Sequence, residues 1–113
     1  MRLRSEVWVH AYLRACQAQL INVAVVRHGD NDAGVIYIKI NRLDGTATLF
    51  GPAPSPISET PYEQSWMVHL DGDGMSEQKV DNFLQRQIQF DSDLWILEVE
   101  DRNGRHELDE WLK

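Results

Sequence analysis

Two short segments of the chain carry His and Asp side chains at the same spacing. The first is RHGDNDAG at residues 27–34, and the second is VHLDGDG at residues 68–74. In each segment one Asp lies two positions after the His, and another lies four positions after it. Imidazole nitrogens and carboxylate oxygens of this kind bind divalent cations when they converge. The candidate ligands are His28, Asp30, Asp32, His69, Asp71 and Asp73.

Neither segment matches an established pattern for binding a metal or a phosphate. A calcium-binding EF-hand loop starting at Asp30 or Asp71 needs Glu at its twelfth position, where the chain has Asn41 or Asn82. Asp and Asn are also typical of tight turns, because their side chains accept hydrogen bonds from the turn backbone, and Gly supplies positive φ. We therefore interpret both segments as turns. The alternative is a metal-dependent hydrolase built from the six candidate ligands.

The other reactive side chains form no recognisable catalytic motif. Cys16, the only cysteine, falls within an apolar helical stripe, and we expect a core residue rather than a nucleophile. The chain contains no Gly-x-Ser-x-Gly motif. Glu98 and Glu100 share one face of a predicted strand, which could bring their carboxylates within reach of each other. The sequence thus favours a protein that is not an enzyme, and it assigns no catalytic residue and no cofactor.

The charge of the chain argues against some classes of partner. The net charge is −7, whereas nucleic-acid binding depends on many Lys and Arg side chains that neutralise phosphates. No apolar run approaches the length of a membrane span. The single cysteine excludes an intramolecular disulfide, which fits a reducing compartment. We therefore expect a cytoplasmic protein with neither nucleic acid nor membrane as its partner.

Hydrophobic periodicity predicts the elements that must position these residues. Ser5 and Ser76 precede or begin apolar stripes at helical spacing, and each is expected to cap its helix. The run INVAVVR at residues 21–27 is rich in β-branched residues, which favours a buried strand. The predicted helices cover 5–19, 76–90 and, in the tail, 106–112. The predicted strands cover 21–27, 35–41, 46–51, 62–70 and 94–100.

Several short segments between these elements have the composition of turns and loops. Asp44-Gly45 and Asn103-Gly104 are turn pairs in which Gly adopts positive φ. Residues 51–61 contain all four prolines, so neither a helix nor a central strand can run through them. Within strand 35–41, alternation places Ile36, Ile38 and Ile40 on one face, with Val35, Tyr37 and Lys39 on the other.

The element order predicts the fold class. Strands joined by short turns are expected to be antiparallel neighbours, with the helices covering one face of their sheet. The chain of 113 residues has the length of one domain, which we take to be 1–113. We predict an α+β domain with a largely antiparallel sheet of about five strands and two main helices. The order is α-β-β-β-β-α-β, followed by a short C-terminal helix.

Three segments together carry a resemblance to a protein family. They are MRLRSEVWVHAYLR, RHGDNDAGVIYIKINRLDGTATLFGP and FDSDLWILEVEDRNGRH, which together extend over most of the chain. The sequence resembles an uncharacterised alphaproteobacterial family, the domain of unknown function family 1491. The resemblance implies a bacterial source and a single-domain architecture, and it implies no activity, cofactor or site residue.

These observations lead to one functional hypothesis and one alternative. The acidic charge, the proline-rich loop and a tail carrying Leu108, Trp111 and Leu112 suit contacts with a protein partner or with a second copy of the chain. The function itself stays unknown, and we expect a small binding or regulatory module that acts through protein contacts. The alternative is the metal-dependent hydrolase with ligands from turns 28–32 and 69–73.

Overall fold

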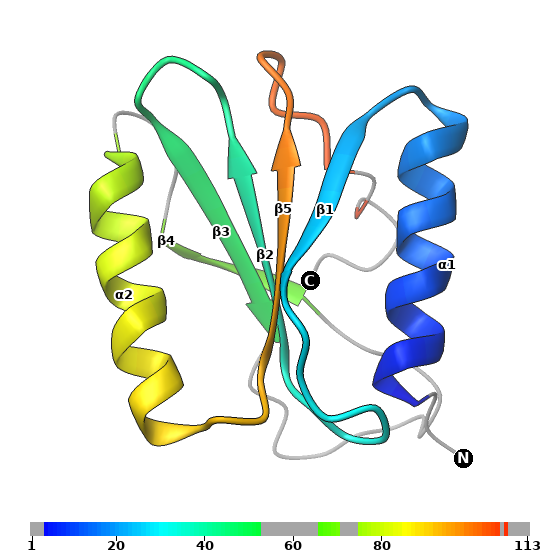
Figure 1. The fold of residues 1–113 in the computed structure, drawn as a ribbon. Coiled ribbons are helices and arrows are strands. Elements are labelled where there is room, and N and C mark those ends of the chain that lie inside the picture. The colour runs from blue at the N-terminus through cyan, green and yellow to red at the C-terminus, as the bar shows by residue number, and fades with distance from the viewer. Residues whose placement is uncertain (1–3, 53–65, 71–74, 107, 109–113) are drawn as a thin grey trace.

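The computed structural model describes residues 4–52, 66–70, 75–106 and 108. Two helices and five strands lie within these residues (Figure 1). In chain order the elements are α1 (Ser5–Ala18), β1 (Asn22–Arg27), β2 (Ile36–Asn41), β3 (Ala47–Pro52), β4 (Trp66–Leu70), α2 (Glu77–Phe90) and β5 (Trp95–Glu100). The predicted α+β class and the order of the main elements are confirmed. Of the predicted strand 62–70, residues 62–65 lie outside the described residues, as does most of the tail.

The five strands form one mixed sheet with the order β1-β5-β2-β3-β4. Three strand pairs are antiparallel, namely β1 with β5, β2 with β3, and β3 with β4. The fourth pair, β2 with β5, is parallel. The largely antiparallel sheet is therefore confirmed, but the expectation that β1 and β2 are neighbours is wrong. The last described strand, β5, inserts between them, because the crossover through α2 returns it to the interior of the sheet beside β2.

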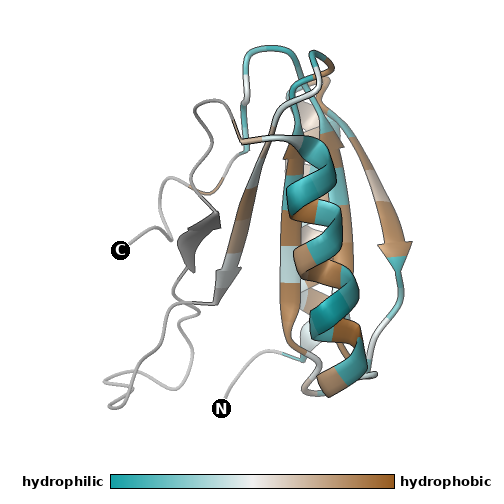
Figure 2. Ribbon diagram, turned by 90° about the vertical axis from the view of Figure 1, so that its left-hand side faces the viewer, coloured by the Kyte–Doolittle hydropathy of each residue, from teal (hydrophilic) through white to brown (hydrophobic). Residues whose placement is uncertain are grey.

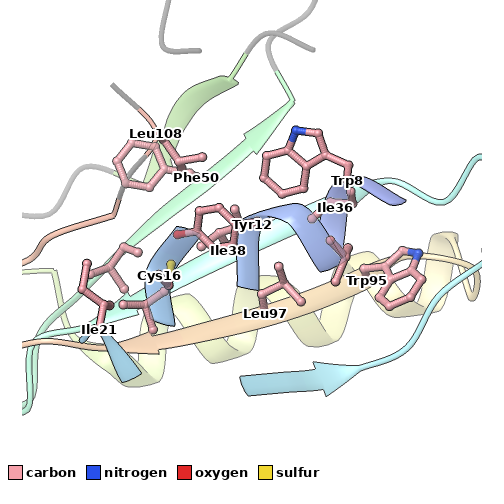
Figure 3. Packing of buried hydrophobic residues seen from close by; sticks show 13 residues of the cluster. Trp8, Tyr12, Cys16, Ile21, Ile36, Ile38, Phe50, Trp95, Leu97 and Leu108 are labelled. Atoms are coloured by element: carbon pink, nitrogen blue, oxygen red, sulfur yellow. The ribbon is translucent and has the colours of Figure 1, made fainter. Parts of the chain in front are cut away.

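The helices cover opposite faces of this sheet, which corrects the expectation that they share one face (Figure 1). On one face Trp8, Val9, Tyr12 and Cys16 of α1 pack against residues of β2 and β5 (Figure 3). On the other face Val80 and Leu84 of α2 pack against Leu49, Tyr37 and Ile96. All six residues of β2 are buried, because both of its faces are covered. Cys16 is a core residue, as predicted.

One of the two predicted helix caps is confirmed and the other is wrong. The Ser76 side chain accepts a hydrogen bond from the backbone N–H of Lys79, which satisfies a donor of the first turn of α2. At α1 the cap position is Arg4, whose side chain makes no capping hydrogen bond. Ser5 is instead the first helical residue, and its hydroxyl donates to the carbonyl oxygen of Gly34 at 2.6 Å. The Ser5 hydroxyl, which the local sequence pattern predicted to cap the helix, instead forms a hydrogen bond with a residue 29 positions away.

Both predicted turn pairs contain the expected left-handed glycine. Gly45 has φ 88° between β2 and β3, and Gly104 has φ 72° after β5. Beyond this turn, Leu108 is fully buried beside Phe50 in the cluster under α1 (Figure 3). That part of the tail packs against the body as predicted, but His106 and Leu108 are not helical, so the helix predicted over 106–112 is wrong at these residues. Trp111 and Leu112 lie outside the described residues. Among the described helices, none is long and apolar enough to cross a membrane.

Candidate functional site

The first His/Asp segment is a turn held by its own carboxylate. One oxygen of Asp30 accepts hydrogen bonds from the backbone N–H groups of Asp32 and Ala33, at 3.1 and 2.8 Å. Asp32 forms an ion pair with Arg4, with 2.7 Å between its Oδ1 and the guanidinium Nε. The ring of His28 lies against Trp95, with 4.0 Å between ring centroids. The three side chains therefore have separate partners, and the turn expected from the sequence is confirmed.

The glycines of this turn are required for a different reason from the one expected. The expectation was positive φ, but Gly29 and Gly34 do not have it. A Cβ atom on Gly29 would lie 2.2 Å from the carbonyl oxygen of Asp93, and one on Gly34 would lie 2.5 Å from the same atom. The N–H of Asp30 donates to this carbonyl at 2.8 Å. The glycines thus allow the turn to approach the backbone that leads into β5.

The second His/Asp segment falls mainly outside the described residues. Asp71 and Asp73 are outside them, and of His69 only the backbone, in β4, is described. Within the described part of the chain, no group of three or more His, Cys, Asp or Glu side chains could hold a metal ion. The metal site that combines both segments therefore stays a prediction.

A buried lysine forms the most charged contact network in the described structure. Lys39 of β2 lies beneath the first turns of α2, with only 4% of its side chain exposed. Its Nζ lies 2.7 Å from Glu77, 2.7 Å from Asp81 and 3.5 Å from Glu98. Asn41 donates to Glu77 and Glu98, at 3.0 and 3.2 Å. The alternation placed Lys39 on this face, but its carboxylate partners come from α2 and β5, which only the fold brings together.

The electrostatics of this network make Lys39 a structural group. Burial by itself would lower the pKa of the Lys39 amine, but hydrogen bonds to Asp81 and Glu77 and the charge of Glu98 outweigh it, so the pKa is raised. A lysine of this kind stays protonated and is a poor nucleophile or base. The carboxylates of Glu98 and Glu100, which the sequence suggested as a pair, have different partners. Glu98 contacts Lys39, whereas Glu100 accepts a hydrogen bond from the Asn22 side-chain amide at 3.2 Å. The network therefore fixes α2 on the sheet.

The exposed edge at β1 is the surface that the sequence did not predict. The run at residues 21–27 was expected to form a buried strand, and this is wrong, because β1 is at the end of the strand order. In Figure 2 it is the outermost strand on the right, with much of its length coloured as apolar. Within the described residues, β1 pairs only with β5. Val25 is 39% exposed and Val26 is 60% exposed.

The C-terminal end of this edge carries the one charged side chain of β1. Arg27 ends β1, and its Nη2 donates to the carbonyl oxygen of Ser92 at 2.9 Å. Its Nε is buried and has no hydrogen-bond partner among the described residues. We define the β1 edge as residues 22–27.

This fold and this edge define a class: a small α+β protein whose mixed sheet is covered by one helix on each face and, among the described residues, ends at an unpaired edge on β1. Solved structures of the same kind exist. A DUF1491 family protein from Caulobacter crescentus CB15, known from a crystal structure, is 33% identical over 100% of this chain and 99% of its own, with a TM-score of 0.81. Its family model, described as a protein of unknown function, matches residues 3–109. The chain belongs to the DUF1491 family.

Two solution structures support this assignment. An NMR structure of a DUF1491 family protein from Caulobacter crescentus CB15 has a TM-score of 0.80 and 33% identity, covering 100% of this chain and 98% of its own. Protein Atu0922 from A. tumefaciens has a TM-score of 0.76 and 34% identity, covering 88% of this chain and 86% of its own. A comparison with curated proteins finds no match. The resemblance seen in the sequence is thus confirmed, and the function of the family is unknown.

Proposed function

We propose that this protein is a small binding module that acts through protein contacts, and that its contact surface is the β1 edge. The main observation in support is that β1 has the composition of a buried strand but lies in an exposed position. Its sequence, NVAVVR, has four apolar residues and no charge before Arg27. Strand edges in natural proteins are usually protected by Lys, Pro, a bulge or a covering element, because unpaired backbone groups recruit other strands.

The protection of β1 is confined to its last residues. The pairing with β5 is regular from Asn22 to Val25, and the register shifts only between Val25 and Arg27. In an antiparallel pair, alternate residues direct their N–H and C=O groups away from the partner strand. Residues 22–25 therefore offer a regular row of donors and acceptors. An extended segment of another chain can add there as a further strand, with the valines supplying apolar contact.

Both sides of the edge are accessible to such a strand. Val23 packs against the core under α1, and Val25 points to the same face, since their β5 partners Val99 and Leu97 are both in that core. Val25 is nevertheless substantially exposed, so α1 leaves the rim of its own face open. Ala24 is exposed on the face of α2. An added strand thus meets no covering helix at this rim among the described elements.

The test compares Val26→Lys with Val7→Lys in the full chain, recovered from its host cells under native conditions. Val7 is 44% exposed on α1, so the control introduces the same charge at a similarly exposed valine. We expect the wild-type assembly to exceed the 13.1 kDa mass of one chain by light scattering. Amide exchange at the N–H groups of residues 22–25 that point away from β5 should be slow in that assembly. Val26→Lys should abolish both properties, and Val7→Lys should leave both unchanged.

Two results would contradict the proposal. One is an assembly whose mass and β1 exchange are the same in wild type and Val26→Lys. The other is a wild-type protein that elutes as a single chain, with rapid exchange at the N–H groups of residues 22–25 that point away from β5. A cytoplasmic location belongs to the same proposal, and its support is the single, buried Cys16 in a chain that forms no internal disulfide.

A further inference from the structure

We infer that the β1 edge pairs with the same edge of a second copy of this chain, in an antiparallel arrangement centred on Ala24. This inference rests on the proposed function, because it names the occupant of that edge. The result is one continuous sheet of two copies related by a two-fold axis perpendicular to it. Closed two-fold dimers are the commonest assembly of identical chains.

The sequence of β1 is self-complementary about Ala24. In an antiparallel pair, directly opposite residues lie on the same face of the sheet, so a symmetric pair is centred on one residue and its own copy. With Ala24 opposite Ala24, each Val23 faces the Val25 of the second copy on the α1 face. Pairs of β-branched residues opposite each other stabilise sheets. The three central positions precede the register shift near Val26, so the irregular part of β1 lies outside them.

The charges at the two ends of β1 complement each other in this arrangement. Arg27 pairs in register with Ile96, and Asn22 with Glu100. Ile96 belongs to the core under α2, and Ala24, two residues from Asn22, lies opposite Glu98 of the network beneath that helix. Arg27 and Glu100 thus lie on the face of α2. The two-fold axis brings Arg27 of one copy beside the Asn22 and Glu100 end of the other, twice per dimer.

This complementarity favours a second copy over an unrelated extended segment. The chain carries a net charge of −7, so two copies repel each other over most of their surfaces. The β1 strand has no acidic residue and one basic residue, Arg27. Its guanidinium donates to the carbonyl oxygen of Ser92 through Nη2 alone, in an exposed position, so the other terminal nitrogen can donate to an approaching Glu100 carboxylate. This contact makes β1 a place where two acidic chains can meet.

The register is tested with single cysteines in the purified full chain. Opposite Cα atoms in antiparallel strands are about 4.5–5.5 Å apart, which is within the range of a disulfide. Ala24→Cys should therefore form a covalent dimer on mild oxidation. Asn22→Cys on the same edge is the matched control, because it faces Val26 rather than itself and should stay monomeric. A mixture of Val23→Cys and Val25→Cys chains should cross-link, whereas each alone should not. The native Cys16 is buried, so it can remain in every variant.

The charge contact is tested by reversal and rescue. Arg27→Glu and Glu100→Arg should each raise the concentration at which the dimer dissociates, by tenfold or more in sedimentation experiments at low salt. The double variant should bring the dissociation constant back to within threefold of wild type. The single variants should lose their effect in high salt, because salt screens exposed charges.

The outcomes separate this inference from the proposed function. A purified chain that stays at 13.1 kDa at every concentration overturns the inference. The proposed function would still hold, with another protein as the partner, if the purified chain is monomeric but the β1 amides exchange slowly in the assembly recovered from cells. A dimer that is unaffected by Val26→Lys and is not cross-linked through Ala24→Cys overturns both. Cross-linking of Asn22→Cys in place of Ala24→Cys overturns the register and with it the inference.

Discussion

Among single residues, Lys39 shows how a charged side chain comes to be buried in the middle of a sheet. Its neighbours on β2 are isoleucines that face α1, so Lys39 itself must face α2. There the ammonium group finds three carboxylates within 4 Å, and Asn41 bridges two of them. A buried ion pair contributes little stability by itself, but removing one partner leaves uncompensated charge behind.

Replacement of Lys39 should therefore lower the stability of the protein, and a second substitution among its carboxylate partners should restore part of it. We expect Lys39→Met to lower the free energy of unfolding by about 2–4 kcal/mol, because Glu77, Asp81 and Glu98 are left close together. Adding Asp81→Asn to Lys39→Met should restore part of this loss, whereas Asp81→Asn alone should cost less than 1 kcal/mol, as expected for an exposed partner. Urea denaturation measures each value. An additive double variant would show that Lys39 and Asp81 do not interact.

The same contact has a defined dependence on pH. The pKa of Lys39 is raised above 10.5 in the folded protein, so the folded state binds its proton more tightly than the unfolded state. Its contribution is fully present below pH 10.5 and is lost as the pH rises through the raised value. The difference in stability between wild type and Lys39→Met should therefore be constant from pH 7 to 9 and shrink above pH 10.5. A difference that already declines near neutral pH would contradict this account.

Among the elements, the two helices start in physically different ways although each has a serine at its beginning. Ser76 caps α2 through its side chain, and we expect Ser76→Ala to cost about 1 kcal/mol. Ser5→Ala removes a buried hydrogen bond to Gly34 instead, at a similar cost of about 1 kcal/mol. Total stability does not separate the two variants, so their amide exchange must be measured.

The pattern of exchange should distinguish a cap from a tertiary contact. Ser76→Ala should speed the exchange of amides in the first turn of α2, around Lys79. Ser5→Ala should speed exchange in the turn at 30–34, because its hydroxyl holds the carbonyl of Gly34. If Ser5→Ala affected only the first turn of α1, then the serine would act as a cap after all.

For the molecule as a whole, the remaining alternative is a metal site that joins the two His/Asp segments. Asp30 already serves as an acceptor for two backbone N–H groups, and Asp32 pairs with Arg4. We expect Mg²⁺, Mn²⁺, Zn²⁺ and Ca²⁺ to leave the melting temperature unchanged, since an ion that binds the native state would raise it. Asp30→Ala should cost about 0.5–1 kcal/mol through lost turn hydrogen bonds. A metal-dependent rise that disappears in both Asp30→Ala and Asp71→Ala would establish the alternative.

Features that depend on neighbouring residues were predictable from the sequence. Apolar periodicity located both helices and all five strands to within a few residues, because side-chain spacing follows the period of each element. The turn at Asp44-Gly45 and the cap at Ser76 followed from local backbone chemistry. The turn at 28–34 was also predictable, although its glycines serve a close approach to Asp93 that no local pattern reveals.

Which strands are neighbours depends on how the whole chain packs, and the resulting strand order leaves the candidate contact surface at the edge of the sheet. Strands 21–27 and 35–41 are adjacent in the chain, yet β5 lies between them, because its apolar residues are buried most completely in an interior strand of a sheet covered on both faces. This insertion moves β1 to the edge and leaves Val25 and Val26 exposed. It also brings Glu98 beside Lys39. A composition rich in valine specifies a strand, but its position in the sheet depends on pairing between residues 69 to 78 positions apart.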